Sequence, residues 1–91
     1  MKLIGKIIEI QDSQQVSDVF KKRLLVIEYA ENPKYPEYIS FELTQNRCDL
    51  IDKFKIGQNV QVSFDLKGNK WLTPEGVTKY FNTIHAWNVE G

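Results

Sequence analysis

The chain has 91 residues, and its 12 Lys and Arg residues balance 12 Asp and Glu residues, so the formal net charge is zero. The content of 42% hydrophobic and 26% charged residues is typical of a folded globular protein and excludes a disordered chain. The charge balance disfavours tight, charge-driven binding of duplex DNA, so nucleic-acid binding would need a local segregation of charge. We expect residues 1–91 to form one domain with a modest core.

Cys48 is the single cysteine and His85 the single histidine. These counts exclude an intramolecular disulfide and a zinc site built from Cys and His. No segment approaches the ~20 apolar residues of a membrane-spanning helix. The N-terminus has neither the apolar core nor the cleavage site of a signal peptide. We therefore expect a cytosolic protein without membrane, metal or cofactor.

The first part of the chain predicts two strands joined by a loop. Leu3–Ile10 is rich in isoleucine, which favours a half-buried strand. Gly5 interrupts it and is typical of a bulge or tight bend, as the curved first strand of a small barrel requires. Asp12–Val19 is polar and indicates a loop. The second strand, Phe20–Tyr29, follows directly.

Phe20–Tyr29 begins with an aromatic residue and three consecutive cations and continues as an apolar, β-branched run. Residues of a strand alternate between faces, so Leu25, Ile27 and Tyr29 are predicted to face the core. The residues of the opposite, partly solvated face are then Lys22, Leu24, Val26 and Glu28. A basic, aromatic entrance to such a strand suits an anionic polymer. Charge alone does not distinguish this from a basic strand end that is merely solvated.

After a loop at 31–36 with two prolines, Glu37–Leu43 predicts a third strand. It alternates cleanly, with Ile39, Phe41 and Leu43 on one face and Tyr38, Ser40 and Glu42 on the other. Thr44 is a candidate N-cap for a short helix over residues 45–54, in which Cys48 is expected to be a small buried residue.

Two further strands complete the chain. Asn59–Leu66 alternates with period two, and 67–70 and 71–79 are predicted to be a turn and a long loop. Tyr80–Val89 carries apolar residues on both faces, including Phe81 and Trp87. The last strand is therefore expected to be covered on one side by the barrel interior and on the other by a partner or a loop. We predict a homodimer or a higher homo-oligomer, because open strand edges also invite pairing.

Three strands, one short helix and two more strands is the element order of an OB-fold. The fold class predicted is all-β: a five-stranded Greek-key barrel with one short helix between strands 3 and 4. Such barrels bind oligonucleotides or sugars across strands 2 and 3, flanked by the first loop and the loop between strands 4 and 5. An SH3-like barrel is the structural alternative, and it lacks a helix at this place.

Several segments, among them 5–8, 20–23, 39–43, 60–65 and 84–90, resemble a family of small one-domain OB-fold proteins of bacteria and phages. That family is itself similar to single-stranded-DNA-binding proteins. The resemblance spans nearly the whole chain and includes the aromatic-Lys-Lys run at Phe20. Members tend to carry Arg where His85 and Asn88 stand, so this chain has less positive charge along its last strand.

Binding of single strands without sequence preference needs cations along the backbone and aromatic platforms for the bases. The candidate platforms are Phe20, Tyr35, Tyr38, Trp71 and Tyr80. The candidate cations are Lys21, Lys22, Arg23, Lys34, Lys70 and Lys79. Three of these cations stand directly before an aromatic candidate in the sequence. Each aromatic also has a structural interpretation: Trp71, for example, could pin its loop to the barrel, and His85 is expected to be a solvated strand residue.

The sequence shows no nucleotide-binding glycine loop, no paired carboxylates that stand out and no triad, so we expect no enzymatic activity. The leading hypothesis is binding of single-stranded DNA, with RNA as a further ligand, in replication, recombination or repair. The alternatives are a protein–protein interaction module and an oligosaccharide-binding domain, which share aromatic platforms but do not need the cations.

Overall fold

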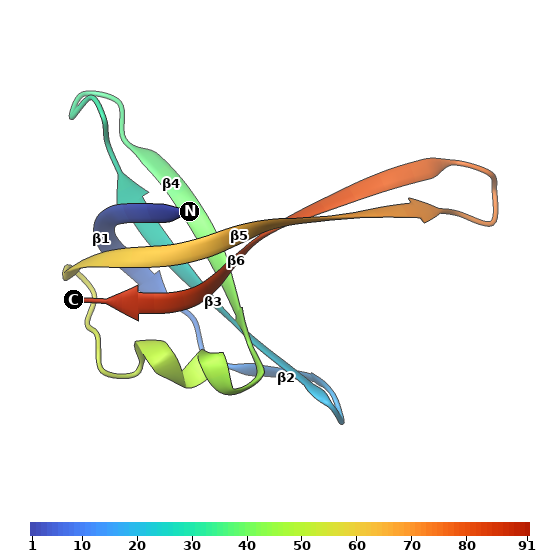
Figure 1. Cartoon of the computed structure of the whole chain (residues 1–91), viewed down its shortest axis with the longest axis horizontal. Coiled ribbons are helices and arrows are strands. Elements are labelled where there is room, and N and C mark those ends of the chain that lie inside the picture. Colours follow the sequence, from blue (N-terminus) through green and yellow to red (C-terminus); the bar gives the residue numbers. More distant parts are fainter.

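The structure is a computed structural model that describes all 91 residues. Its strands are β1 (Lys2–Ile10), β2 (Gln14–Ser17), β3 (Phe20–Tyr29), β4 (Glu37–Thr44), β5 (Asn59–Leu72) and β6 (Thr78–Glu90), with the 3-10 helix η1 (Gln45–Ile51) between β4 and β5. Figure 1 shows a small barrel from which the distal parts of β5 and β6 project as a long hairpin. None of the helical structure has the length and apolarity that a bilayer crossing requires.

The first strand closes one side of the barrel because it pairs with two others. Its first half is antiparallel to β5, and its second half is antiparallel to β3. A Cβ atom on Gly5 would lie 2.6 Å from the carbonyl oxygen of Glu28, so only glycine permits this approach of β3. The strand bulge lies a little further on, between Ile7 and Glu9.

The other side of the barrel is closed by a single parallel bridge, between Glu42 of β4 and His85 of β6. Through this bridge the strand order β1-β5-β6-β4-β3 returns to β1. Five strands therefore form a barrel, with the helix between its third and fourth long strands. This is the OB-fold arrangement, and the predicted fold class is confirmed.

The core forms largely where the predicted alternation placed it, but Tyr29, also predicted to face the core, is only half-buried and its hydroxyl donates to Glu31. Leu25 and Ile27 of β3 and Phe41 and Leu43 of β4 are fully buried, as is Cys48 of η1. The Cys48 thiol donates to the carbonyl of Leu43 at 3.4 Å, and burial raises its pKa. The prediction that Cys48 is a small core residue is therefore confirmed.

The largest error of the sequence prediction concerns residues 67–79. The predicted turn at 67–70 and loop at 71–79 are mostly strand, because β5 continues to Leu72 and pairs with β6 from Thr78 onward. The real turn lies at 73–77, where Gly76 has φ +83 and the Thr73 hydroxyl accepts from the Val77 amide at 3.1 Å. Leu66, the last residue of the predicted alternating strand, is exposed because the hairpin has left the barrel by this point.

Three smaller predictions also need correction. The polar segment 12–19 contains β2, which pairs with the start of β3 and extends the sheet. The helix is a 3-10 helix that ends at Ile51. Thr44 makes no side-chain cap bond, because its hydroxyl is hydrogen-bonded to His85 instead.

Candidate nucleic-acid interface

The outer face of the β3–β4 pair is the first part of the candidate interface. Directly opposite residues of an antiparallel pair share a face, and Leu25 and Phe41 point inward. The cross-strand pairs that face outward are therefore Lys22 with Thr44, Leu24 with Glu42, Val26 with Ser40, and Glu28 with Tyr38. Three of these eight residues are apolar or aromatic, one is a lysine and two are glutamates. We call this surface the outer face.

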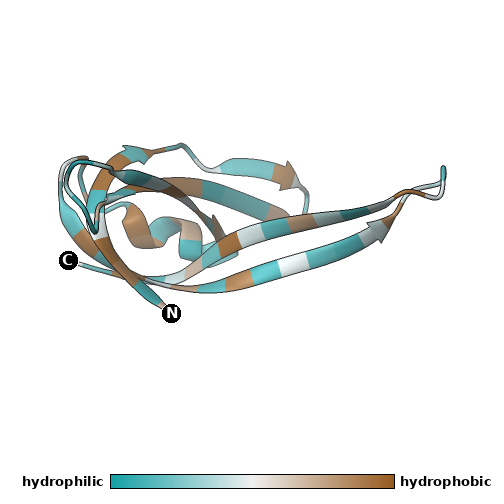
Figure 2. Ribbon diagram, turned by 90° about the horizontal axis from the view of Figure 1, so that it is seen from above, coloured by the Kyte–Doolittle hydropathy of each residue, from teal (hydrophilic) through white to brown (hydrophobic).

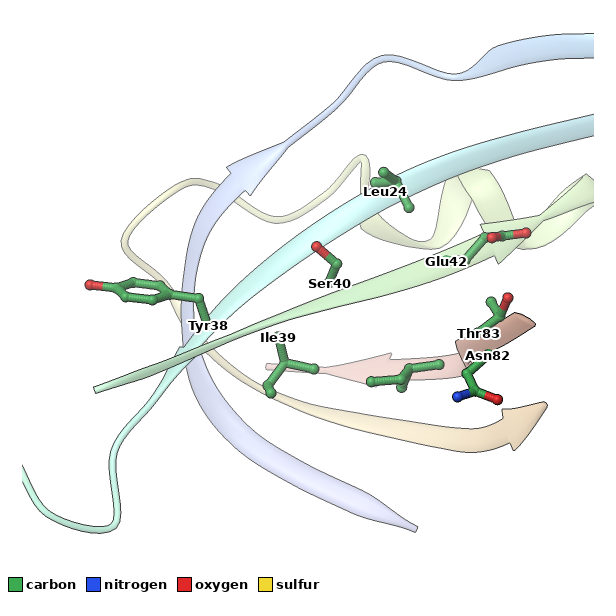
Figure 3. Close-up of a pocket in the computed structure, with 8 residues that line it drawn as sticks. Leu24, Tyr38, Ile39, Ser40, Glu42, Asn82 and Thr83 are labelled. Carbon is green, nitrogen blue, oxygen red and sulfur yellow. The ribbon is translucent and has the colours of Figure 1, made fainter. Parts of the chain in front are cut away.

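A cavity of about 420 Å³ lies where the outer face meets the base of the hairpin. Its lining residues are Leu24 from β3, Tyr38, Ile39, Ser40 and Glu42 from β4, and Asn82, Thr83 and Ile84 from β6 (Figure 3). The cavity exists because β4 and β6 are bridged only at Glu42 and His85. On one side of this bridge the two strands diverge, and side chains of both line the space.

The projecting hairpin is the second part of the candidate interface. Figure 2 shows it standing clear of the barrel, with apolar and polar residues along both strands. Lys70 lies directly opposite Tyr80, and Trp71 lies directly opposite Lys79. Because side chains alternate along each strand, these two couples lie on opposite faces of the hairpin. Each couple therefore places one aromatic ring beside one lysine.

The exposure of the aromatic candidates on the hairpin and β4 fits a stacking role. Trp71 is 54% exposed and Tyr80 is 70% exposed, so neither pins the hairpin to the barrel. The Trp71 ring pairs with Phe81 on the same face, with 6.3 Å between ring centroids. Tyr38 is 58% exposed on the outer face. Phe81 is a further aromatic residue of the hairpin that the sequence analysis had assigned to a partner-covered strand.

The basic run at the start of β3 is used differently from what the sequence predicted. The Arg23 guanidinium donates to the carbonyls of Gln11 at 2.7 Å and Cys48 at 3.0 Å, and it pairs with Asp52. Only 13% of its side chain is exposed. Arg23 therefore joins the first loop and the helix to β3. Its Nε and Nη1 donors are engaged within the protein, so the structure gives Arg23 a role in the fold, and its predicted contact with nucleic acid stays a prediction.

Alternation separates the two lysines of the same run. Lys21 shares the helix side of β3 with Arg23, and its ammonium group lies 3.5 Å from Asp49 of η1. Lys22 lies on the outer face, opposite Thr44. Phe20 is half-buried at the beginning of the strand. The predicted basic entrance therefore contributes one cation, Lys22, to the outer face.

Lys34 and Tyr35 lie in the β3–β4 connection, and both are exposed. Figure 1 places this connection on one side of the barrel and the tip of the hairpin on the opposite side. The structure therefore does not bring the predicted residues into one pocket. It arranges them as a discontinuous track from the connection across the outer face to the hairpin.

His85 is buried rather than solvated, with 6% of its surface exposed. Its Nε2 lies 2.9 Å from the Thr44 hydroxyl. Burial, and then the positive charges of Lys67 and Arg47, lower the pKa of the imidazole. His85 thus joins the base of the hairpin to β4 as an uncharged group, and the sequence prediction of a solvated residue is wrong.

The sequence analysis missed the residues that give the cavity its chemistry. Alternation placed Glu42 on the outer face, but it was not considered as part of a site. Asn82 and Thr83 of the last strand were not considered as site residues either. Alternation in β4 was the one available signal, since it groups Glu42 with Tyr38 and Ser40. The contribution of β6 depends on the barrel closure and has no local signal.

Solved structures with the same fold include two proteins of known type. The crystal structure of the mitochondrial single-stranded DNA binding protein Rim1 from S. cerevisiae superposes with a TM-score of 0.69 and 11% identity, covering 99% of this chain and 90% of Rim1. The dimeric N-terminal domain of PriB from Thermoanaerobacter tencongensis gives 0.66 and 16%, covering 99% and 91%. At these identities the likeness establishes the fold.

The fold defines a small OB-fold protein that is similar in architecture to Rim1 and PriB, and the fold resemblance drawn from the sequence is confirmed. The chain belongs to the family described as "Domain of unknown function (DUF3127)", which it matches over residues 2–90. A sequence comparison with curated proteins finds no match.

Proposed function

We propose that the protein binds single-stranded DNA without a fixed sequence, through the outer face and the β5–β6 hairpin. The observation that carries this proposal is the pair of exposed cation–aromatic couples on the hairpin, Lys70 opposite Tyr80 and Trp71 opposite Lys79. Each couple offers a ring for a base and a cation for the neighbouring phosphate. The OB-fold neighbours whose names describe single-stranded DNA binding support the same ligand class.

The mechanism is binding rather than catalysis. Bases would stack on exposed rings such as Trp71, Tyr80 and Tyr38, each stacked base contributing roughly 1–3 kcal/mol. Lysines beside the rings would neutralise phosphates and release counterions. In a duplex the bases are stacked on one another, so they are not free to stack on these aromatic side chains. This role suits an accessory protein in replication, recombination or repair.

A titration of labelled oligo-dT, followed by fluorescence anisotropy at low and moderate salt, tests the proposal. We expect binding whose logarithmic salt slope is about −0.7 per neutralised phosphate on a single strand. The slope should be shallow, because few free lysines line the track and the net charge is zero. A duplex of equal length should bind more weakly, and oligo-U in the same assay measures the DNA–RNA preference. Absence of binding, or an affinity that does not change with salt concentration, would contradict the proposal.

A protein–protein interaction module is the second candidate function. Ile4 on β1 is 67% exposed and Trp87 on β6 is 42% exposed, and both strands flank β5 on the barrel. Val89, two residues beyond Trp87 on the same strand, is buried in the core and contributes nothing to such a surface. We propose that a second copy of this chain covers Ile4 and Trp87 in a homodimer. Light scattering that gives the monomer mass at tens of micromolar protein would contradict the dimer.

A further inference from the structure

Glu42 occupies an unusual position for an acidic residue on a DNA-binding surface. It lies in the middle of the outer face, opposite Leu24, and its side chain lines the cavity at the base of the hairpin. The two ion pairs of the chain, Lys21–Asp49 and Arg23–Asp52, do not involve it, and its carboxylate makes no hydrogen bond within the protein. Glu42 is half-buried at the cavity wall, and its carboxylate, which only accepts hydrogen bonds, has no donor from the protein within reach.

The other walls of the cavity are suited to a flat ring with polar edges. Leu24, Ile39 and Ile84 provide apolar contact for the face of a ring. Ser40, Asn82 and Thr83 add a hydroxyl, an amide and a second hydroxyl. An aromatic ring that presents N–H donors toward Glu42 would satisfy the carboxylate and bury its own apolar faces.

We propose that this cavity is a nucleobase subsite that prefers cytosine to thymine, and that Glu42 determines the preference. The inference rests on the proposed binding of single-stranded DNA and adds a base preference at one position of an otherwise sequence-tolerant track. Cytosine carries an exocyclic N4 amino group, a donor that carboxylates accept in base recognition. Thymine carries the O4 carbonyl at the corresponding position. In the same pose thymine sets its O4 acceptor against the carboxylate, where cytosine offers a donor.

The negative charge of Glu42 gives a second way to test the proposed cytosine preference. The Glu42 carboxylate repels phosphates whichever base is bound, but only cytosine compensates this with a hydrogen bond. Removal of the carboxylate should therefore have opposite effects on the two ligands. Binding of oligo-dT should tighten, and binding of oligo-dC should weaken relative to it.

Competition of unlabelled oligo-dC and oligo-dT of equal length against one labelled strand, at neutral pH and fixed salt, measures this preference. For the wild-type protein we expect oligo-dC to bind about fivefold to tenfold more tightly, the lower end of the range for base-specific contacts. Glu42→Ala should bring the ratio close to one. Glu42→Gln, which keeps one acceptor oxygen, should retain part of the preference and shows that the effect does not come from misfolding.

Glu28→Ala is the matched control, because Glu28 is an acid on the same outer face, opposite Tyr38, that does not line the cavity. Glu28→Ala should tighten the binding of both oligonucleotides equally and leave the ratio of their affinities unchanged. Equal binding of both oligonucleotides by the wild-type protein, or a ratio that Glu42→Ala does not alter, would overturn the subsite while leaving the proposed function intact. If neither oligonucleotide binds, the proposed function itself fails.

Discussion

The start of β3 and the distal β5–β6 hairpin both combine aromatic residues with cations, but they use those cations differently. At β3, Arg23 and Lys21 pair with Asp52 and Asp49, and these are the two ion pairs of the chain. On the hairpin, the lysines have aromatic rings rather than carboxylates across the strand pair. The first region therefore holds the barrel and helix together, and the second presents charge to solvent. Similar composition serves folding in one place and is available for binding in the other.

The physical reason for the difference is the surroundings of each strand. The start of β3 lies beside η1, whose carbonyls and acids offer partners for Arg23 on one side of the strand. Where the distal hairpin projects from the barrel, it packs against no other element (Figure 1). Its side chains therefore meet only their cross-strand neighbours. A cation is free for a ligand where no acid or carbonyl of the fold reaches it.

The largest expected effect concerns stability at β3. Arg23→Ala removes charged hydrogen bonds to two backbone carbonyls and the ion pair with Asp52, and it leaves the carbonyls without these donors. We expect the free energy of unfolding in urea to fall by about 2–3 kcal/mol. Arg23→Lys should recover little, because a single ammonium group cannot reproduce the planar guanidinium. A stability within about 0.5 kcal/mol of wild type would show that the two regions do not differ as described.

The second effect concerns binding at the hairpin and compares its two faces. Trp71→Ala should weaken oligo-dT binding by roughly 1–3 kcal/mol, the range for one stacked base. Its stability should change little beyond the modest contact with Phe81, because Trp71 is exposed. Tyr80→Ala is the matched variant on the opposite face. Loss of binding in one variant alone identifies the face that contacts DNA, and a Trp71→Ala protein that unfolds would instead assign the tryptophan to packing.

The third effect concerns the junction between hairpin and barrel. The pKa of His85 lies below the usual value of 6.5 because the imidazole is buried. The unfolded chain therefore takes up a proton that the folded protein does not, so the free energy of unfolding should fall as the pH drops below about 6.5. Urea denaturation at neutral and mildly acidic pH measures this, and His85→Gln should lose that part of the pH dependence. An unchanged dependence in His85→Gln would assign it to other groups.

The smallest effect separates neighbouring lysines of β3. Lys22→Ala removes a cation of the outer face and should reduce the magnitude of the salt slope for oligo-dT by up to about 0.7, the value for one phosphate contact. Lys21→Ala, on the helix side beside Asp49, should leave the slope unchanged. Folding of both variants should stay within about 0.5 kcal/mol of wild type. If both substitutions changed the salt slope equally, Lys21 and Lys22 would not lie on different faces of β3 as described.

The barrel was predictable from sequence because its strands have one buried face. Alternation identified Leu25, Ile27, Phe41 and Leu43 as core residues, and the element order identified the OB-fold. The hairpin was not predictable in the same way. Both faces of its distal part are exposed, so no alternation marks it, and the Lys67–Lys70 segment has the composition of a turn.

The candidate site was only partly predictable for a related reason. Trp71, Tyr80 and Tyr38 are exposed, as the predicted platforms require, although Trp71 lies in a strand rather than in the predicted loop. The engagement of Arg23 and the cavity around Glu42 depend on contacts between elements far apart in the chain. Such contacts leave no local pattern, so composition alone assigned the cations of β3 to the candidate site and overlooked the cavity lined by β4 and β6.

The central claim is that the hairpin aromatics are platforms for bases, and Trp71 fluorescence tests it most directly. Trp87→Phe leaves Trp71 as the one tryptophan of the chain. Titration of this variant with oligo-dT should quench the emission to saturation, and added salt should reverse the quenching as phosphates are released. Emission that stays constant while the anisotropy of a labelled oligo-dT shows saturated binding would contradict the claim.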